Sequence, residues 1–281
     1  MKTQLIAFFV LAGTYTSAQE VFISPKISEQ WATPEGLKIP ESVLYDPSAN
    51  VFYVSNMGNY PDEQGKAGFI SRISEGGEIL DIKWIDGLDS PTGMGLVDDR
   101  LYVAEIDQVT EIDKTQGAVI KTYRVNGARF LNDIATGADG KVFISDSDDS
   151  AVYLLDNGSI KLFLKSDKLS GINGLWVHGN NLLAGLSDKI VSISLSDKSV
   201  TNYILNTGDI DGIVPDGRGN YLISSWIGRI HLVGQSTEKE MLLDTTPEKI
   251  NSADIEFIID KRLLLVPTFY DSRVVCYKLA E

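Results

Sequence analysis

Short apolar runs alternate with turn residues along almost the whole chain. The clearest runs span residues 51–55, 101–104, 141–145, 221–225 and 263–266, and each mixes β-branched or aromatic residues with polar ones. Runs of this length and alternation, bounded by Gly, Pro, Asn and Asp, are typical of β-strands. No segment carries a sustained apolar stripe with the spacing of a helix, so the pattern predicts an all-β fold.

One sequence pattern recurs six times: a small or acidic polar residue, an apolar-rich strand, a turn and a second strand. The first residues of the copies are Glu41, Thr92, Asn132, Asn173, Asp211 and Asp254, at intervals of 51, 40, 41, 38 and 43 residues. This interval is the repeat length of a four-stranded propeller blade, whereas a β-sandwich has no reason to repeat one pattern. We therefore predict a six-bladed β-propeller with four-stranded antiparallel blades. Residues 19–36 are expected to supply a strand that pairs with residues 274–279 and closes the ring.

The N-terminus has the features of a cleavable secretory signal. Lys2 precedes a short apolar stretch, and small residues lead up to Ala18. That stretch is too short to span a bilayer, and no later stretch reaches the roughly 20 apolar residues of a transmembrane helix. The alternative is a buried first strand. We predict a signal peptide at 1–18, cut after Ala18, and a single propeller domain at 19–281 located in the periplasm or the extracellular space.

Net charge restricts the classes of binding partner, and cysteine content restricts the sources of stability. The formal net charge is −14, and removal of residues 1–18 leaves 24 basic against 39 acidic residues, or −15. Nucleic acids and anionic membrane surfaces are disfavoured as partners, because binding them needs basic patches that the sequence lacks. Cys276 is the only cysteine, so no intramolecular disulfide can form, and stability must come from the packed core and any bound metal.

The six repeated positions suggest a metal site. The innermost strands of a propeller surround a central channel, so equivalent positions form a ring at one mouth. Glu41, Asn132, Asn173 and Asp211 carry oxygen donors of the kind that hard cations prefer. Two carboxylates within about 5 Å, at an effective dielectric constant near 20, repel each other by roughly 3 kcal/mol, and a divalent cation reverses that sign. The ring therefore predicts a Ca²⁺ site, with another divalent cation as the alternative.

These residues also have other interpretations. The Asn and Asp side chains could simply begin strands and hydrogen-bond to loop backbone, although this leaves their shared register unexplained. Zinc is disfavoured because His178 and His231 lie far from the repeated positions. The acidic segment 146–149 lacks the glycine and the terminal glutamate of a calcium-binding loop, so we interpret it as a solvated turn.

Four segments resemble a known family. Residues 41–42, 129–133, 172–174 and 210–212 look like the metal-site segments of the regucalcin and gluconolactonase family. They also resemble those of the wider six-bladed, calcium-dependent hydrolases that include paraoxonase and diisopropyl fluorophosphatase. The resemblance implies that Glu41, Asn173 and Asp211 bind the metal directly, and that Asn132 binds the metal or holds substrate and water.

The resemblance is incomplete at the residues expected to contact the substrate. Arg129 matches an arginine that can hold an anionic or hydroxyl-rich substrate, but Leu131 is an extra residue in that segment. The alternative for Arg129 is a surface loop residue. The chain is short for the family and has no histidine pair like that of the paraoxonase-like lactonases. The identity of a small-molecule substrate therefore does not carry over.

The function implied is metal-dependent hydrolysis of a small lactone or ester. The metal would polarise the carbonyl, and Asp211 would activate water or attack. A serine hydrolase is disfavoured because Gly-x-Ser-x-Gly is absent and neither histidine has a Ser and Asp partner at motif spacing. The alternative is a non-catalytic binding propeller with a structural metal, in which the four tryptophans line a recognition surface or pack between blades. The sequence does not identify a protein partner.

Overall fold

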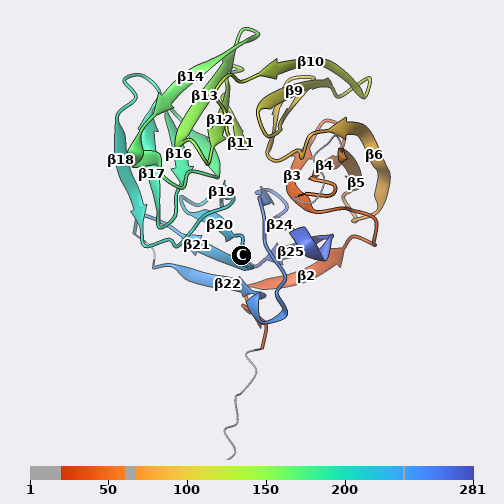
Figure 1. The fold of residues 1–281 in the computed structure, drawn as a ribbon. Helices are drawn as coiled ribbons and strands as arrows, with labels where there is room; N and C mark the ends of the chain where they lie inside the picture. The colour runs from red at the N-terminus through yellow and green to blue at the C-terminus, as the bar shows by residue number, and fades with distance from the viewer. Residues whose placement is uncertain (1–19, 61–66, 237) are drawn as a thin grey trace, which may run out of the picture.

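Six antiparallel sheets stand in a ring around a central axis (Figure 1), which confirms the six-bladed β-propeller. The computed structural model describes residues 20–60, 67–236 and 238–281. The predicted signal peptide at 1–18 lies outside these residues. Within the described ranges, helix is limited to three short 3₁₀ segments: η1 (Asp167–Leu169), η2 (Thr246–Glu248) and η3 (Phe269–Asp271).

The first four blades each take four consecutive strands of the chain. Blade one contains β3 (Pro40–Asp46), β4 (Val51–Asn56), β5 (Gly68–Ser74) and β6 (Ile79–Leu88). Blade two contains β7 (Met94–Val97), β8 (Arg100–Ala104), β9 (Gln108–Asp113) and β10 (Ala118–Arg124). Blade three contains β11 (Leu131–Thr136), β12 (Val142–Asp146), β13 (Ala151–Asp156) and β14 (Ser159–Lys165). Blade four contains β15 (Leu175–His178), β16 (Asn181–Gly185), β17 (Lys189–Ser194) and β18 (Val200–Leu205).

The last two blades also use the beginning of the chain. Blade five contains β19 (Ile213–Pro215), β20 (Tyr221–Ser225), β21 (Arg229–Val233) and β22 (Glu240–Asp244). Blade six contains β23 (Glu256–Ile258), β24 (Leu263–Pro267), β25 (Val274–Leu279) and, as its outer strand, β2 (Ile27–Ala32). The pairing of Ile27 with Leu279 and of Ala32 with Val275 confirms the predicted closure. The short strand β1 (Phe22–Ile23) adds to the edge of β22, which the sequence pattern did not predict.

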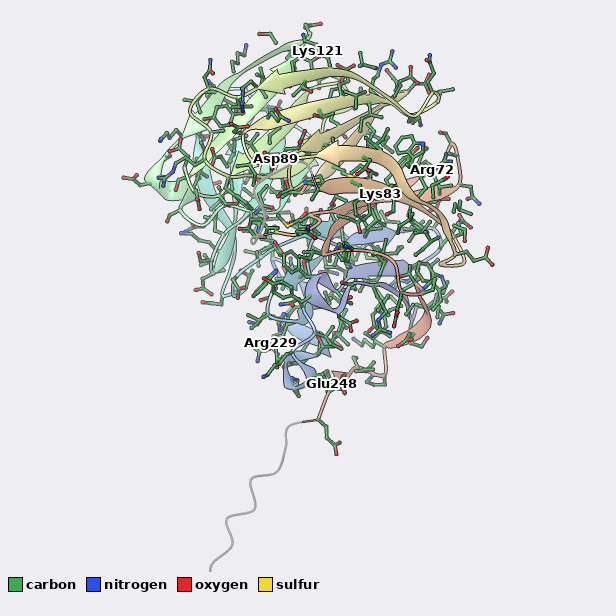
Figure 2. The ribbon with its side chains drawn as sticks, turned by 45° about the vertical axis from the view of Figure 1, so that its right-hand side comes forward. Arg72, Lys83, Asp89, Lys121, Arg229 and Glu248 are labelled. Carbon is green, nitrogen blue, oxygen red and sulfur yellow. The ribbon has the colours of Figure 1, made fainter. Side chains whose placement is uncertain are left out.

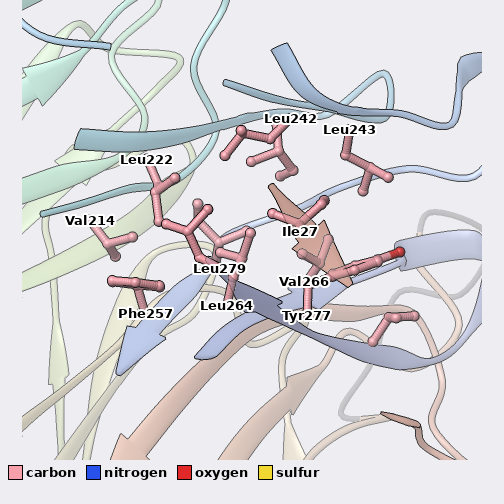
Figure 3. Close-up of a cluster of buried hydrophobic side chains, with 13 residues drawn as sticks. Ile27, Val214, Leu222, Leu242, Leu243, Phe257, Leu264, Val266, Tyr277 and Leu279 are labelled. Atoms are coloured by element: carbon pink, nitrogen blue, oxygen red, sulfur yellow. The ribbon is translucent and has the colours of Figure 1, made fainter. Parts of the chain in front are cut away.

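Six of the seven apolar clusters of the described residues lie between neighbouring blades, one at each interface. Successive side chains of a strand point to opposite faces, so each blade packs against both neighbours. On β4, Tyr53 joins the cluster with blade two, whereas Phe52 and Val54 join the cluster with blade six. Figure 3 shows the cluster between blades five and six, where Ile27 of β2 packs with residues of β22 and β24.

Charged side chains decorate the outer surface of the ring, where Figure 2 labels Arg72, Lys83 and Lys121. Arg72 of β5 pairs with Asp81 of β6, its Nε lying 2.9 Å from the carboxylate. Exposed pairs of this kind contribute little stability, so the six interblade clusters hold the ring together. In the part of the chain that the structure describes, no helix has the length and apolar character needed to cross a membrane.

Candidate metal centre at the channel mouth

Five of the repeated residues occupy equivalent backbone positions, whereas in blade six the equivalent residue is Ala253, whose N–H donates to the Pro267 carbonyl at 3.0 Å, and not Asp254. In blades two, four and five, the first residue of the pattern donates its N–H to a carbonyl near the end of the second strand. These bonds join Thr92 to Ala104 at 2.9 Å, Asn173 to Gly185 at 3.0 Å, and Asp211 to Ser224 at 2.8 Å. The shared register inferred from the sequence therefore places these positions at one end of the innermost strands.

A repeated serine fixes the next residue in blades one, three and five. The hydroxyls of Ser55, Ser145 and Ser224 each accept a backbone N–H, from Ser42, Asp133 and Gly212 respectively, at 2.8 to 2.9 Å. A buried donor that is satisfied in this way holds the strand entry rigidly. The backbone next to the preceding residue, such as Glu41 or Asp211, is thereby held in place, and with it the position of that side chain's Cβ.

Glycines let the innermost strands approach closely. A Cβ at Gly174 would lie 2.4 Å from the carbonyl oxygen of Asp211, and one at Gly212 would lie 2.5 Å from Oδ1 of Asp254. Such separations are far below van der Waals contact, so no larger residue fits without moving the backbone. The glycines keep the channel narrow and bring the side chains of neighbouring blades together.

Three of the four predicted ligands face one cavity. Asn132, Asn173 and Asp211 line a cavity of about 320 Å³ at the mouth, over blades three to five. The Asn173 amide donates to Oδ1 of Asp211 at 2.6 Å, and the Asn132 amide donates to the Ser147 hydroxyl at 3.1 Å. Glu41 is only 5% exposed and does not line this cavity, although its charge interacts with that of Asp211.

Two buried oxygens at this site have no hydrogen-bond partner. Across residues 20–60, 67–236 and 238–281, the only buried side-chain polar atoms without one are Oε2 of Glu41 and Oδ1 of Asn173. Leaving a buried acceptor unsatisfied costs about 1–3 kcal/mol, and more when it is charged. Both atoms belong to predicted ligands, so their unused lone pairs fit the donor set of a hard cation.

The electrostatics of the site also fit a cation. Burial raises the pKa of Asp211 to about 7, with a further contribution from Asp209, while the hydrogen bond from Asn173 opposes the rise. Burial raises the pKa of Glu41 well above its ordinary value, and the charges of Asp211 and Asp133 add to it. These carboxylates lack a compensating positive side chain among the groups that shift them, so a bound cation would supply the missing charge.

Two further buried carboxylates lie deeper in the channel. Asp133 and Asp254 face a narrow cavity of about 60 Å³ on the channel axis. Burial raises the pKa of Asp133 to about 7, even though the N–H groups of Leu175 and Ile134 both donate to it at 2.6 Å. Burial and the charge of Asp133 raise the pKa of Asp254 well above its ordinary value.

The sequence did not single out this deeper pair. Asp133 follows Asn132 at a position where three of the other copies have glycine. An aspartate in place of that glycine was the feature of the sequence that could have indicated a functional residue. Asp254 begins the sixth copy of the pattern in the sequence, but in the structure it lies one position after Ala253, the residue of blade six equivalent to the predicted ligands. Its Oδ2 accepts the Ser42 hydroxyl at 2.6 Å.

The remaining predicted residues behave differently. The Arg129 side chain is exposed and is not among the residues that line the mouth cavity, so its role in holding substrate stays a prediction. The interpretation of segment 146–149 as a solvated turn is wrong for Asp146, which is fully buried. Its carboxylate accepts the backbone N–H groups of Arg129, Phe130 and Asp149, because the loop entering blade three needs these donors satisfied.

The metal interpretation and the alternative, in which these residues only cap loop backbone, predict different hydrogen-bond partners for the side chains. Asp133 and Asp146 do accept backbone N–H groups, whereas Oε2 of Glu41 and Oδ1 of Asn173 accept nothing. No three His, Cys, Asp or Glu side chains of the described residues are grouped as a ready metal site. The candidate centre therefore depends on two carboxylates together with two amides, which is a donor set for calcium and not for zinc.

Three of the four tryptophans pack between blades, and the fourth is exposed. Trp84 stacks on Tyr53 with ring centroids 4.9 Å apart, and Trp31 packs with Phe52 between blades six and one. Trp176 packs partly between blades four and five. Trp226 differs, because it is 40% exposed and lines the mouth cavity.

Comparison with known proteins supports the fold. No protein-family model and no curated protein matches the sequence. A structure described as a proposed gluconolactonase superposes with a TM-score of 0.67 and 14% identity, covering 92% of this chain and 94% of that one. A streptogramin B lyase gives 0.64 and 11%, covering 90% and 97%, and the virginiamycin B lyase of Staphylococcus aureus gives 0.62 and 15%, covering 90% and 99%. At these identities the likeness concerns the fold, and it extends over nearly the whole chain.

Proposed function

We propose that this propeller is a Ca²⁺-dependent hydrolase of small lactones or esters, with Glu41, Asn132, Asn173 and Asp211 holding the metal. The observation that carries the proposal is the pair of unpartnered buried oxygens, Oε2 of Glu41 and Oδ1 of Asn173, at the mouth of the channel. Asn173 lines a cavity of about 320 Å³, which has room for a small molecule. The fold shared with a proposed gluconolactonase is consistent with this reaction.

The residues take distinct roles in the proposed reaction. A divalent cation bound here would act as a Lewis acid toward the substrate carbonyl. Asp211 lines the cavity and can activate water, while Asn173 fixes its carboxylate through the 2.6 Å hydrogen bond. Asn132, whose amide donates to Ser147, would hold the metal or the substrate. Glu41 is too deeply buried to contact substrate, so its proposed role is to bind the metal and balance its positive charge.

Turnover by the full chain on a panel of sugar lactones, aliphatic lactones and aryl esters, with calcium or with chelator, tests the proposal. Asp211→Ala is expected to abolish calcium-dependent turnover while the protein stays folded. The matched control is Asp99→Ala, which removes an exposed aspartate in the turn after β7, at the far end of that strand from Thr92. Unchanged activity of Asp211→Ala would refute the assignment.

The second candidate is a binding propeller in which the metal only stabilises the channel. The exposed indole of Trp226 beside the cavity favours this candidate, because exposed aromatics often serve recognition. Two neighbouring structures are lyases, so the fold alone does not select hydrolysis. Calcium-dependent melting without turnover of any ester or lactone is the result expected for the binding protein. Action outside the cytoplasm, after cleavage behind Ala18, completes the proposal, and N-terminal sequencing of the mature protein tests that step.

A further inference from the structure

Over the part of the channel mouth that the structure describes, an apolar cluster and a cavity lie side by side. An apolar cluster formed by Ile39, Met57, Tyr60, Phe130, Ala253 and Phe269 gathers side chains from blades one, three and six. Ile39 and Ala253 are close neighbours in sequence of the buried Glu41 and Asp254. The cavity lies over blades three to five, so among the described residues it offers a ligand a route to Asp211 on that side.

Aromatic side chains form part of the wall of this cavity. Phe130 and Trp226 both line it. The indole of Trp226 is supported by edge contacts with Phe269 and Tyr270, at 5.5 and 6.0 Å between ring centroids. The Trp226 backbone is held as well, since its carbonyl accepts the Asn251 amide at 2.8 Å. A supported and 40% exposed indole offers a surface for a flat apolar or aromatic group.

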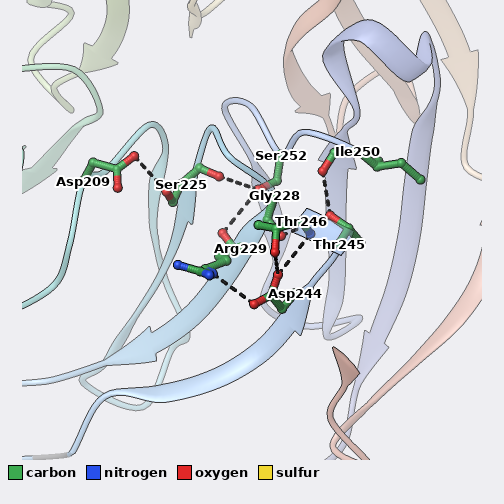
Figure 4. Close-up of polar contacts among 9 residues, drawn as sticks. All are labelled: Asp209, Ser225, Gly228, Arg229, Asp244, Thr245, Thr246, Ile250 and Ser252. Carbon is green, nitrogen blue, oxygen red and sulfur yellow. Dashed lines mark hydrogen bonds and ion pairs between the residues drawn. The ribbon is translucent and has the colours of Figure 1, made fainter. Parts of the chain in front are cut away.

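The charged groups of the cavity wall are all acidic. In the described structure, the ionisable residues lining it are Asp148, Asp209 and Asp211, and no Lys, Arg or His lines it. Figure 4 shows Asp209 held by the Ser225 hydroxyl at 2.7 Å, while Arg229 is paired with Asp244 at 3.0 Å. Asp148 and Asp209 are exposed and are not candidate metal ligands. A divalent cation would balance Glu41 and Asp211, and the cavity would still carry these two negative charges.

We propose that the mouth cavity selects ligands in which a flat apolar or aromatic group carries a positive charge. The ring would lie against Trp226 and Phe130, and the cationic group would lie between Asp148 and Asp209. Indole faces attract ammonium groups, and the two carboxylates add to this attraction while repelling anions. The inference rests on the proposed function only for the reacting end of the substrate, which would be an ester or lactone carbonyl facing Asp211.

Binding is tested on the full, calcium-loaded chain at low salt and about pH 8, by ligand-detected NMR. The probes are phenyltrimethylammonium and N,N-dimethylaniline, which share a ring but differ in charge. The cation is expected to bind roughly 5- to 30-fold more tightly. The double variant Asp148→Asn/Asp209→Asn should reduce this preference to less than about threefold and leave the neutral probe unaffected. Asp99→Asn, the same substitution outside the cavity, should change neither probe.

Trp226 is tested with the same probes. Trp226→Ala is expected to weaken both probes by roughly fivefold or more, and Trp226→Phe should restore most of that loss because it returns an aromatic face. Hydrolysis is compared with phenyl acetate and its 3-trimethylammonio derivative. The charged ester should show the lower KM, and the double variant should raise that KM alone.

The outcomes separate this inference from the proposed hydrolysis. Equal binding of the two probes, or a preference that survives the double variant, overturns the inference. A cation preference without turnover of either ester overturns the hydrolase and leaves the binding inference standing. Turnover of both esters with equal KM overturns the inference and leaves the hydrolase standing.

Discussion

Replacing Asp211 with Asn should make the metal-free protein more stable. The substitution keeps the shape of the side chain and its contact with Asn173 but removes a buried negative charge. The pKa of Asp211 is about 7 in the folded protein against an ordinary value of 3.8. That difference of about 3 units corresponds to about 4 kcal/mol, which is the upper limit of the gain.

The gain depends on pH in a defined direction. Because the folded-state pKa of Asp211 is raised, this group favours the folded wild-type protein most below about pH 4, where it is protonated. That contribution to the free energy of unfolding is lost as the pH rises through about 7. In chelator, the variant should therefore exceed the wild type above pH 7 and match it near pH 4. With calcium the order should reverse, because the variant loses a charged ligand and with it most of the calcium-induced increase in stability.

Urea unfolding at pH 8 and pH 4, with calcium or chelator, measures these differences. The matched control is Asp216→Asn in the same blade, because Asp216 is buried but accepts donors from Arg218 and Asn220 at 2.7 to 3.1 Å. Loss of these charge-assisted bonds should destabilise the control by about 1–3 kcal/mol in both conditions. A metal-free Asp211→Asn protein that is less stable than the wild type at pH 8 would refute the electrostatic reasoning.

Three further predictions concern the stability of the fold. Gly174→Ala should lower both the melting temperature and the calcium affinity. The control Gly76→Ala, whose Cβ meets only one atom at 3.8 Å, should melt like the wild type, and equal melting temperatures of the two variants would contradict the close strand approach. Lys114→Ala should reduce the free energy of unfolding by about 3 kcal/mol, because it strands the buried Asp46, whose Oδ2 lies 3.0 Å from the ammonium, and a double-mutant cycle measures the coupling. Burial, with help from nearby Lys and Arg charges, lowers the pKa of His231 to about 4, so acidification from about pH 6.5 to 4 should cost up to about 3 kcal/mol that His231→Leu does not lose. An identical pH dependence in the two proteins would refute the last of these.

Much of the site could be predicted because the repeat carries its register in the sequence. Aligning the copies placed Asn132, Asn173 and Asp211 at equivalent strand entries, and the structure brings all three to one cavity. Asp146 was misjudged because an acidic segment looks the same whether water or loop N–H groups satisfy it. Asp133 was missed because it lies outside the repeated position and acts through neighbours from another blade.

The sequence by itself determined the blade count, the strand order and the closing pair, since alternation and repeat length are properties of neighbouring residues in the chain. It also predicted that Asn132, Asn173 and Asp211 lie together at the channel mouth. Only the tertiary structure decided which of their oxygens lack partners, how far burial raises the pKa of Asp211, and which blades line the mouth cavity. Those properties depend on side chains that lie tens of residues apart in sequence and meet when six blades close around one axis.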